Sequence, residues 1–320
     1  MNGGDAVTAA DHDIIVIGAG VAGLTAARVA AEGGARVLLM ERLGAGGQVS
    51  TVDRIGNFPG HPEIGGYELG PLLQDAAEAA GAGMALAEAT GLSRSGGLWR
   101  VQNDAGEMSA NCVILACGST RKPLGVPGEA AFVGRGVSHC ASCDGGFFRG
   151  KRVVVVGGGD SALDEALVLA PMVDEVVLVH RGTTFDATQG QETDLQARPN
   201  VRTLFQTEVT AVEGDDTGMT GVMLHGASGT QLLPAAGLFV YIGLAPNTGL
   251  VEGLVDKDSD GRVMVSDRLE SRAAGLFAAG DLRHGTRAML DGAAADGALA
   301  ARSALERLHK GKTAGSEEET

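Results

Sequence analysis

Residues 14–42 read IIVIGAGVAGLTAARVAAEGGARVLLMER, and residues 153–181 read VVVVGGGDSALDEALVLAPMVDEVVLVHR. The two segments align without a gap. Each consists of an apolar run, a glycine-rich turn, a helix-like stretch and a second apolar run. This order is typical of the strand–turn–helix–strand unit that binds the pyrophosphate of a dinucleotide. Two such units in one chain predict two bound dinucleotides.

The first unit has a complete G-x-G-x-x-G turn at Gly18, Gly20 and Gly23. Glycine permits a tight turn at the first site, close approach of the backbone to the pyrophosphate at the second, and close packing of helix on strand at the third. A lone match is weak evidence, because ordinary glycine turns also produce it. Here the pattern also predicts a buried strand over 14–17 and a helix over about 21–32, so we interpret the turn as a nucleotide site.

The second unit has the turn Gly157–Ala162, with sequence GGGDSA, after an expected strand over 153–156. Alanine replaces the third glycine and is still small enough for close packing. Pro171 ends the helix, and a second strand is expected over 176–179. The candidate nucleotide-binding residues of this turn are Gly158, Gly159, Asp160 and Ser161.

The second strands of the two units end differently. In the alignment Glu41 lies opposite His180, and Arg42 lies opposite Arg181. A carboxylate such as that of Glu41 accepts hydrogen bonds from a free ribose diol and repels a 2′-phosphate, so it suits the adenosine of FAD. A guanidinium binds phosphate oxygens in a forked geometry, so Arg181 favours NADPH, unless it is simply a solvated surface arginine.

Length, composition and charge limit the classes of protein to which this chain can belong. The chain has 320 residues, 44% of them hydrophobic, which is enough for one large core or two ordinary ones. A formal charge of −15 argues against a nucleic-acid partner. No apolar run reaches the length of a membrane span, and the polar N-terminus lacks the apolar stretch of a signal peptide. We therefore expect a cytoplasmic protein that does not enter membranes.

The four cysteines fall into two groups. Cys112 and Cys117 lie in the run NCVILACG and are expected to pack as small apolar residues. Cys140 and Cys143 form a Cys-x-x-Cys that is followed by Asp144. This spacing allows a small disulfide ring and favours a reactive thiolate, while the adjacent carboxylate can accept and return a proton. The alternative is half of a zinc site, but the chain has no second Cys-x-x-Cys or His pair, so we predict no metal.

With these motifs the chain resembles the low-molecular-weight thioredoxin reductases, over residues 13 to about 308. Besides the cysteine motif and the two glycine turns, the resemblance rests on residues 46–60, 241–248 and 279–281. It implies an α/β fold of two three-layer, Rossmann-like domains. The NAD(P)H domain (121–245) carries the cysteines and is inserted into an FAD domain split into 1–120 and 246–320. In the family the inserted domain rotates, which alternately brings nicotinamide and disulfide to the flavin.

The resemblance also implies residue roles. Cys143 would face the flavin, Cys140 would attack the substrate disulfide, and Asp144 would handle protons. FAD would contact Gly18, Gly20, Gly23, Glu41, Arg42, Gly47, Gln48, Asn57, Gly280, Asp281, Arg287, Ala288 and Met289. NADPH would contact Gly158, Gly159, Asp160, Ser161, His180 and Arg181. Electrons would pass from NADPH to flavin, to the cysteine pair and then to thioredoxin or a similar small redox protein, in a homodimeric enzyme.

Three departures from the family pattern stand out. The family usually has further arginines after His-Arg, and at those positions this chain has Gly182 and Asp186. The electron donor can therefore be NADH or another reductant instead of NADPH. The usual Arg-Gln-Ala over the flavin reads Arg287-Ala-Met. His139 stands where tyrosine is common, so the partner surface can differ.

Several functions remain open at this point. The leading hypothesis is an NAD(P)H-dependent flavoprotein disulfide reductase. The alternatives are a flavin dithiol oxidase or reductase acting on a small-molecule disulfide, a ferredoxin-linked reductase, and a redox-inactive nucleotide sensor. The complete second glycine turn argues against the oxidase, whereas Gly182 and Asp186 argue for it.

Overall fold

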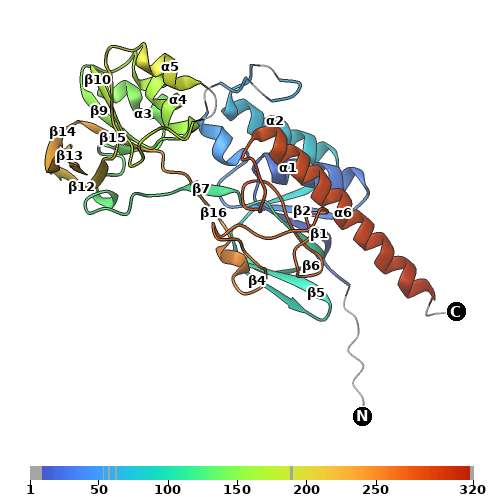
Figure 1. The fold of residues 1–320 in the computed structure, drawn as a ribbon. Helices are drawn as coiled ribbons and strands as arrows, with labels where there is room; N and C mark the ends of the chain where they lie inside the picture. Colours follow the sequence, from blue (N-terminus) through green and yellow to red (C-terminus); the bar gives the residue numbers. More distant parts are fainter. Residues whose placement is uncertain (1–8, 53, 57, 62, 188–189, 318–320) are drawn as a thin grey trace. The chain divides into compact units, whose positions relative to one another are not determined.

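The structure is a computed structural model that describes residues 9–52, 54–56, 58–61, 63–187 and 190–317. The chain divides into two compact units (Figure 1). The first unit is Met1–Ser119 together with Pro246–Thr320, and the second unit is Thr120–Ala245. Which nucleotide each unit binds stays a prediction.

A seven-stranded sheet forms the centre of the first unit, in the order β3-β2-β1-β6-β5-β4, with β17 also paired to β6. Strands β1, β2, β3, β6 and β17 are parallel, whereas β4, β5 and β6 form an antiparallel meander. The strands are β1 (His12–Ile17), β2 (Val37–Glu41), β3 (Gly83–Leu86), β4 (Ala89–Ser95), β5 (Leu98–Asn103), β6 (Gly106–Leu115) and β17 (Leu276–Ala278).

Both faces of this sheet are buried, one by the α-helices of this unit and the other by the loop segments that carry Val251, Val255 and Val263. Ile14 and Val16 belong to one buried cluster, which includes Leu24 of a helix, while Ile15 and Ile17 belong to a second cluster. Burial on both faces explains why the strand is apolar at every position. The α-helices are α1 (Val21–Glu32), which packs against both others, α2 (Gly66–Ala79) and α6 (Leu290–Glu317); short 3₁₀ turns are η1 (Gly47–Thr51) and η4 (Gly249–Val251).

The second unit has a five-stranded parallel sheet in the order β11-β10-β9-β15-β8 and a three-stranded antiparallel sheet, β12-β13-β14. The strands are β8 (Val137–Ser138), β9 (Arg152–Val156), β10 (Glu175–Val179), β11 (Val201–Leu204), β12 (Glu208–Asp215), β13 (Gly218–Gly226), β14 (Gly229–Pro234) and β15 (Gly237–Val240). The helices are α3 (Ala141–Asp144), α4 (Asp160–Leu169) and α5 (Gln191–Gln196), with 3₁₀ turns η2 (Ala130–Phe132) and η3 (Gly145–Phe148).

The two faces of β9 bury different neighbours. Val153 and Val155 lie in a cluster with Leu163 of α4, whereas Val154 and Val156 lie in a cluster with Val222 of β13. The second unit is therefore helix, parallel sheet and antiparallel sheet in three layers. At the boundary between the units, β7 (Ser119–Arg121) pairs with β16 (Leu244–Pro246).

The predicted α/β class with two Rossmann-like motifs is confirmed, since each repeat forms a parallel strand, a helix and a second parallel strand. Cys112 is buried in β6, and Cys117 follows that strand. Among the described residues, no helix combines the length and the apolar character that crossing a membrane requires.

Candidate active site

The glycine turn of the first unit leaves no room for side chains at two positions. Gly18 has a φ of +103°, and a Cβ there would lie 2.5 Å from the carbonyl oxygen of Ala116. A Cβ at Gly23 would lie 1.8 Å from the carbonyl oxygen of Gly18. Both distances are far below van der Waals contact, so the turn and the helix can pack this closely only with glycine.

Gly20 is different, because a Cβ there would meet no atom within 4 Å. It is the N-cap of α1 and has no side-chain hydrogen bond to that helix end. A second glycine-rich loop runs alongside it: Gly46 donates its N–H to the carbonyl of Ala19 at 2.8 Å, and a Cβ at Gly47 would lie 3.3 Å from Gly20 Cα. Open space beside uncapped helical N–H groups fits a dinucleotide pyrophosphate.

Glu41, at the end of β2, is held against the glycine turn. Its Oε2 accepts the N–H of Ala19 at 2.8 Å, and its Oε1 accepts the N–H of Leu43 at 2.9 Å. These bonds fix the carboxylate beside the turn and leave further lone pairs for a ribose diol. Arg42 is exposed, and its Nη1 lies 3.8 Å from Glu88 Oε1; no hydrogen bond or ion pair between described residues ties it to the turn.

Three residues far apart in the sequence meet in the first unit. Gln48 donates from Nε2 to the carbonyl and hydroxyl oxygens of Ser119, both at 2.9 Å. Ser119 Oγ donates to Asp281 Oδ2 at 3.0 Å. The sequence motifs pointed to Gln48 and Asp281 but missed Ser119, because its role depends on contacts 71 and 162 residues away along the chain.

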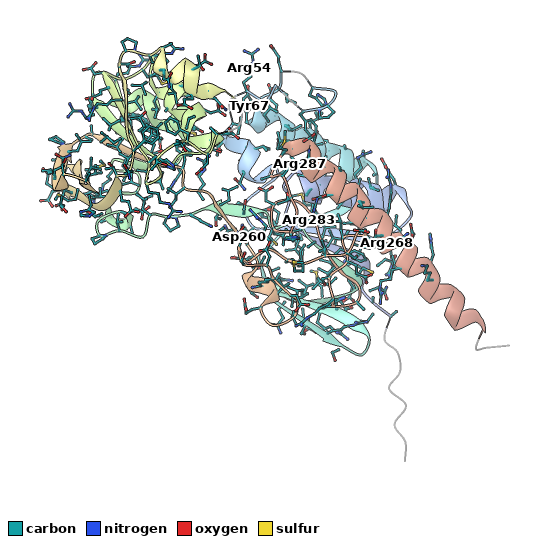
Figure 2. All side chains as sticks on the ribbon, in the orientation of Figure 1. Arg54, Tyr67, Asp260, Arg268, Arg283 and Arg287 are labelled. Carbon is teal, nitrogen blue, oxygen red and sulfur yellow. A yellow bond between two sulfur atoms is a disulfide. The ribbon has the colours of Figure 1, made fainter. Side chains whose placement is uncertain are left out.

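The turn at Gly280 rests on a partly buried ion pair. Asp296 of α6 accepts the N–H of Gly280 at 3.0 Å and two bonds from Arg283, both at 2.7 Å. Arg287, which Figure 2 labels with Arg283, is exposed, as are Ala288 and Met289 just before α6. Ala288 has a φ of +52°, a strained conformation for a residue with a Cβ. No hydrogen bond or ion pair ties these three to the Gln48 cluster, and Asn57 lies outside the described residues.

The second unit builds an equivalent turn. Gly157 has a φ of +151°, and a Cβ there would lie 2.3 Å from the carbonyl oxygen of Tyr241. A Cβ at Gly159 would meet nothing within 4 Å, and this residue is the N-cap of α4 without a side-chain cap. Asp160 and Ser161 begin that helix. The open middle position, again at a helix N-terminus, fits a second pyrophosphate.

His180 occupies the space beside this turn. Its side chain is only 9% exposed, and a Cβ at Gly158 would lie 2.2 Å from its Nδ1. The imidazole therefore supports the turn from inside the fold. Arg181 is exposed, and Asp186 places Oδ2 4.0 Å from His180 Nε2.

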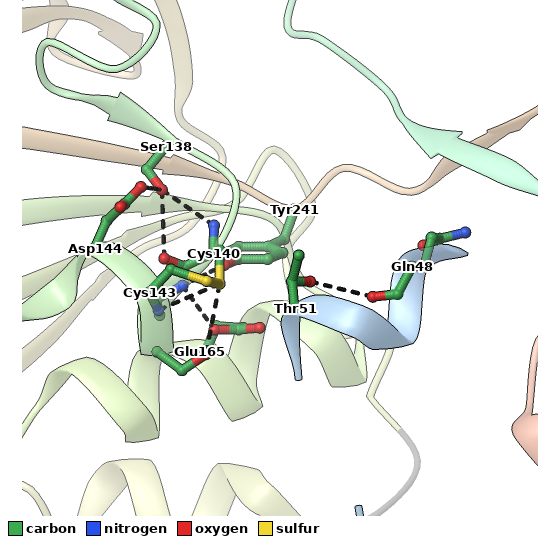
Figure 3. The surroundings of a disulfide bond; sticks show 10 residues. Gln48, Thr51, Ser138, Cys140, Cys143, Asp144, Glu165 and Tyr241 are labelled. Atoms are coloured by element: carbon green, nitrogen blue, oxygen red, sulfur yellow. Dashed lines mark hydrogen bonds between the residues drawn. A yellow bond between two sulfur atoms is a disulfide. The ribbon is translucent and has the colours of Figure 1, made fainter. Parts of the chain in front are cut away.

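The two cysteines of the Cys-x-x-Cys are bonded to each other, with Cα atoms 5.3 Å apart (Figure 3). Cys140 is the N-cap of α3, and its sulfur accepts the backbone N–H of Cys143 at 3.2 Å. Cys143 is exposed, whereas Cys140 is half-buried. The N–H stabilises negative charge on the Cys140 sulfur once the disulfide opens, which suits that sulfur to be the attacking thiolate.

Asp144 lies at the end of the same short helix and is oriented by a serine that sequence reasoning missed. Ser138 Oγ donates to Asp144 Oδ2 at 2.6 Å and accepts the N–H of Cys140 at 3.1 Å. The hydroxyl thereby links the carboxylate to the backbone of the redox pair. His139 turns away from this chemistry, with Nδ1 3.3 Å from the carbonyl oxygen of Val240.

A half-buried acid contacts the first residue of α3. The backbone N–H of Ala141 donates to both Glu165 Oε2 and the hydroxyl of Tyr241, each at 3.1 Å. Burial raises the pKa of the Glu165 carboxyl, although the Ala141 N–H and the charge of Arg121 oppose that rise. Burial is the main cause of the raised pKa of the Tyr241 hydroxyl, and the negative charge of Glu165 raises that pKa further. Arg121 lies over the Tyr241 ring, 4.9 Å from its centroid.

The chain therefore has two glycine-rich turns that fit dinucleotides, called cradles below, and a cysteine pair whose disulfide can be reduced and re-formed. A family model described as pyridine nucleotide-disulphide oxidoreductase matches residues 12–298. The chain is similar to the thioredoxin reductase of Treponema pallidum, with 38% identity over 93% of this chain and 97% of the relative. It is also 36% identical to that of Bacillus subtilis, over 91% of this chain and 93% of the relative.

Solved structures of thioredoxin reductases are also similar to this chain. The thioredoxin reductase of Lactococcus lactis aligns with a TM-score of 0.87 and 32% identity, over 92% of this chain and 98% of that one. The enzyme of T. acidophilum aligns with a TM-score of 0.84, 32% identity and the same coverage. The family resemblance inferred from the sequence is confirmed, and membership implies FAD and a pyridine nucleotide. The chain thus belongs to the pyridine nucleotide-disulphide oxidoreductases and, within them, to the thioredoxin reductase family.

Proposed function

We propose that this protein reduces the disulfide of a thioredoxin-like protein with electrons from a reduced nicotinamide dinucleotide. The observation that carries the proposal is the Cys140–Cys143 disulfide, which lies next to Asp144 in a chain with two dinucleotide cradles. The partner is inferred from the names of the relatives, which are thioredoxin reductases. The homodimer and the cytoplasmic location stay predictions.

The first unit would hold FAD. Gly18, Gly20 and Gly23 would receive its pyrophosphate at the start of α1, and Glu41 would accept from its ribose. Gly47, Gln48 and Asp281 would line the same nucleotide, supported by Ser119. Bound FAD supplies a two-electron carrier between the nicotinamide and the disulfide. Contacts from Arg42, Asn57, Gly280, Arg287, Ala288 and Met289 to FAD remain part of the proposal.

The second unit would hold the nicotinamide dinucleotide. Gly158, Gly159, Asp160 and Ser161 form the turn that would receive its pyrophosphate at the start of α4. Arg181 would lie toward the adenosine end, because it directly follows the strand end where that ribose binds in such folds. His180 would act indirectly, by supporting Gly158.

The cysteine pair would carry out thiol–disulfide exchange with the partner. In the reduced pair, Cys140 as thiolate attacks one sulfur of the partner disulfide, and the other partner sulfur leaves as a thiolate that takes a proton. Cys143 then attacks the Cys140 sulfur of this mixed disulfide and releases the partner as a dithiol. The second leaving thiolate also takes a proton, so the partner gains two electrons and two protons.

Asp144 would move these protons. Its carboxylate is held by Ser138 at the end of the helix that carries Cys143, close to both thiols in the chain. A positioned acid or base of this kind contributes about 10²–10⁴-fold to a proton-transfer step. Asp144→Asn keeps the shape and removes that capacity, so we expect slower partner reduction and unchanged flavin reduction.

The matched variants Cys140→Ser and Cys143→Ser test the proposal. Both should keep bleaching of the flavin by the nicotinamide nucleotide under argon, and both should lose thioredoxin turnover. Only Cys143→Ser should form a mixed disulfide with a single-cysteine thioredoxin that carries an aromatic thiol as leaving group. Thioredoxin turnover by Cys140→Ser would contradict the assigned nucleophile, and a flavin that no nicotinamide nucleotide reduces would contradict the proposed electron source.

A further inference from the structure

We propose that the electron donor is NADH rather than NADPH, because Asp186 places a carboxylate at the adenosine-ribose end of the second cradle. This inference rests on the proposed function, since it assumes that the Gly157–Ser161 turn binds a nicotinamide dinucleotide. It assigns Asp186 as the residue that determines which nucleotide is accepted.

The internal repeat locates this end of the cradle. Gly158 of the second turn corresponds to Ala19 of the first, and His180 corresponds to Glu41. In the first unit the strand-end carboxylate of Glu41 contacts Ala19 N–H directly, at 2.8 Å. A carboxylate at this place is the group that binds a ribose 2′-hydroxyl in such folds.

In the second unit the strand-end side chain is used differently. The His180 ring is buried against Gly158, where a Cβ would lie 2.2 Å from its Nδ1. The imidazole takes up the space between the glycine turn and the loop that follows β10. It therefore holds the loop in place, and the residues left to meet the ribose come from that loop.

The backbone of Asp186 is hydrogen-bonded to the glycine turn. Its N–H donates to the carbonyl of Gly158 at 2.8 Å, and its carboxylate oxygen lies 4.0 Å from His180 Nε2. Its side chain is 83% exposed, so the carboxylate is open to a ligand. The preceding residue, Phe185, packs against Phe205 with ring centroids 4.8 Å apart, which anchors the loop. The second unit thus also has a carboxylate beside its glycine turn, but this carboxylate comes from the loop after β10 and not from the end of the strand.

The same loop has little positive charge for a 2′-phosphate. Between residues 180 and 186, Arg181 is the only arginine or lysine, and the turn adds the acid Asp160. Gly182 cannot simply be replaced by a cation, because a Cβ there would lie 2.5 Å from His180 Nε2. A 2′-phosphate carries nearly two negative charges near neutral pH, and a carboxylate a few ångströms away repels it by roughly tenfold in binding even when water screens the pair.

The test compares wild type with Asp186→Asn, an isosteric change that removes the charge. The control is Asp216→Asn, which removes the same charge from the exposed turn between β12 and β13 in the same unit. Steady-state kcat/KM is measured for NADH and NADPH with a disulfide acceptor. Calorimetry on the oxidised holoenzyme gives Kd for NAD⁺ and NADP⁺ independently of turnover.

We expect wild type to favour NADH by about tenfold or more in kcat/KM, and NAD⁺ over NADP⁺ in Kd. Asp186→Asn should improve both NADPH values by roughly tenfold and leave NADH values equal or weaker, whereas Asp216→Asn should change neither ratio. Preference for NADPH in wild type, or equal responses of the two variants, would overturn the inference and leave the proposed function intact. Failure of both nucleotides to bind or reduce the flavin would instead overturn the proposed function.

Discussion

Replacement of Asp296 by alanine tests how the Gly280 turn is held in the first unit. Asp296 is buried, with a side chain 9% exposed, and it accepts two bonds from Arg283 and one from the N–H of Gly280. Its loss leaves a partly buried guanidinium without its charged partner, which typically costs about 3–5 kcal/mol. Because the Arg283 side chain is 21% exposed and water can reach it, we expect the lower end, about 3 kcal/mol.

The same helix provides a matched control. Glu306 of α6 pairs with Arg268, but this ion pair is at the surface, with side chains 50% and 58% exposed. Exposed pairs contribute little to stability because water screens the charges, so Glu306→Ala should cost far less than Asp296→Ala. Both substitutions place alanine in one helix, so the difference in helix propensity is small.

Thermal unfolding of the holoenzyme, followed by flavin fluorescence, measures both effects. A loss of about 3 kcal/mol lowers Tm by about 6–12 °C in a unit of 150–250 residues, whereas the Tm of the Glu306 variant should change much less. FAD should also dissociate more readily from Asp296→Ala, because the Gly280–Asp281 turn loses its support. Equal shifts in the two variants, or no weakening of FAD retention, would refute the reasoning.

Three further predictions follow from the described contacts. Gly23→Ala places a Cβ 1.8 Å from a carbonyl oxygen, whereas a Cβ at the exposed Gly249 of the same unit meets nothing within 4 Å, so Gly23→Ala but not Gly249→Ala should purify without its full flavin absorbance; equal flavin content would contradict the packing argument. Burial raises the pKa of Glu165 above its ordinary 4.5, so its contribution favours the folded state at low pH and is lost as pH rises through the raised pKa. Glu165→Gln should remove that part of the pH dependence of unfolding, and an unchanged dependence would contradict it. Burial raises the pKa of Cys112 to about 12 and that of Cys117 to about 11, so neither native thiol should react with iodoacetamide at pH 8, and prompt labelling of either would contradict this.

Much of the fold was predictable because the repeat carries local rules. Apolar runs that are buried on both faces predict parallel strands, and positions such as Gly18, Gly23 and Gly157 leave no space for a Cβ. The observed bounds, His12–Ile17 and Val21–Glu32 in the first repeat, differ little from the expected 14–17 and 21–32. The antiparallel sheet β12-β13-β14 was not predicted, since its strands have no motif and only partial alternation.

The site was predictable only where a motif marks it. Cys140, Cys143 and Asp144 stand out in the sequence, but Ser138 became visible only when its hydroxyl was placed between Asp144 and the backbone of Cys140. Glu165 likewise meets the redox helix from 24 residues away.

His180 shows the limit of reasoning by alignment. The sequence predicts that it contacts the nucleotide, and the structure shows its ring buried against Gly158; contact with a nucleotide stays a prediction. A strand-end residue can point into the fold instead of toward the ligand, and the sequence alone does not distinguish the two.

The most direct test of the central claim is a thiol map of the holoenzyme after anaerobic reduction. One equivalent of reduced nicotinamide nucleotide is added under argon, free thiols are alkylated, and the peptides are weighed. We predict that label appears on Cys140 and Cys143 together, and on neither cysteine without the nucleotide. A flavin that bleaches while both cysteines stay unlabelled would contradict transfer of electrons to this disulfide.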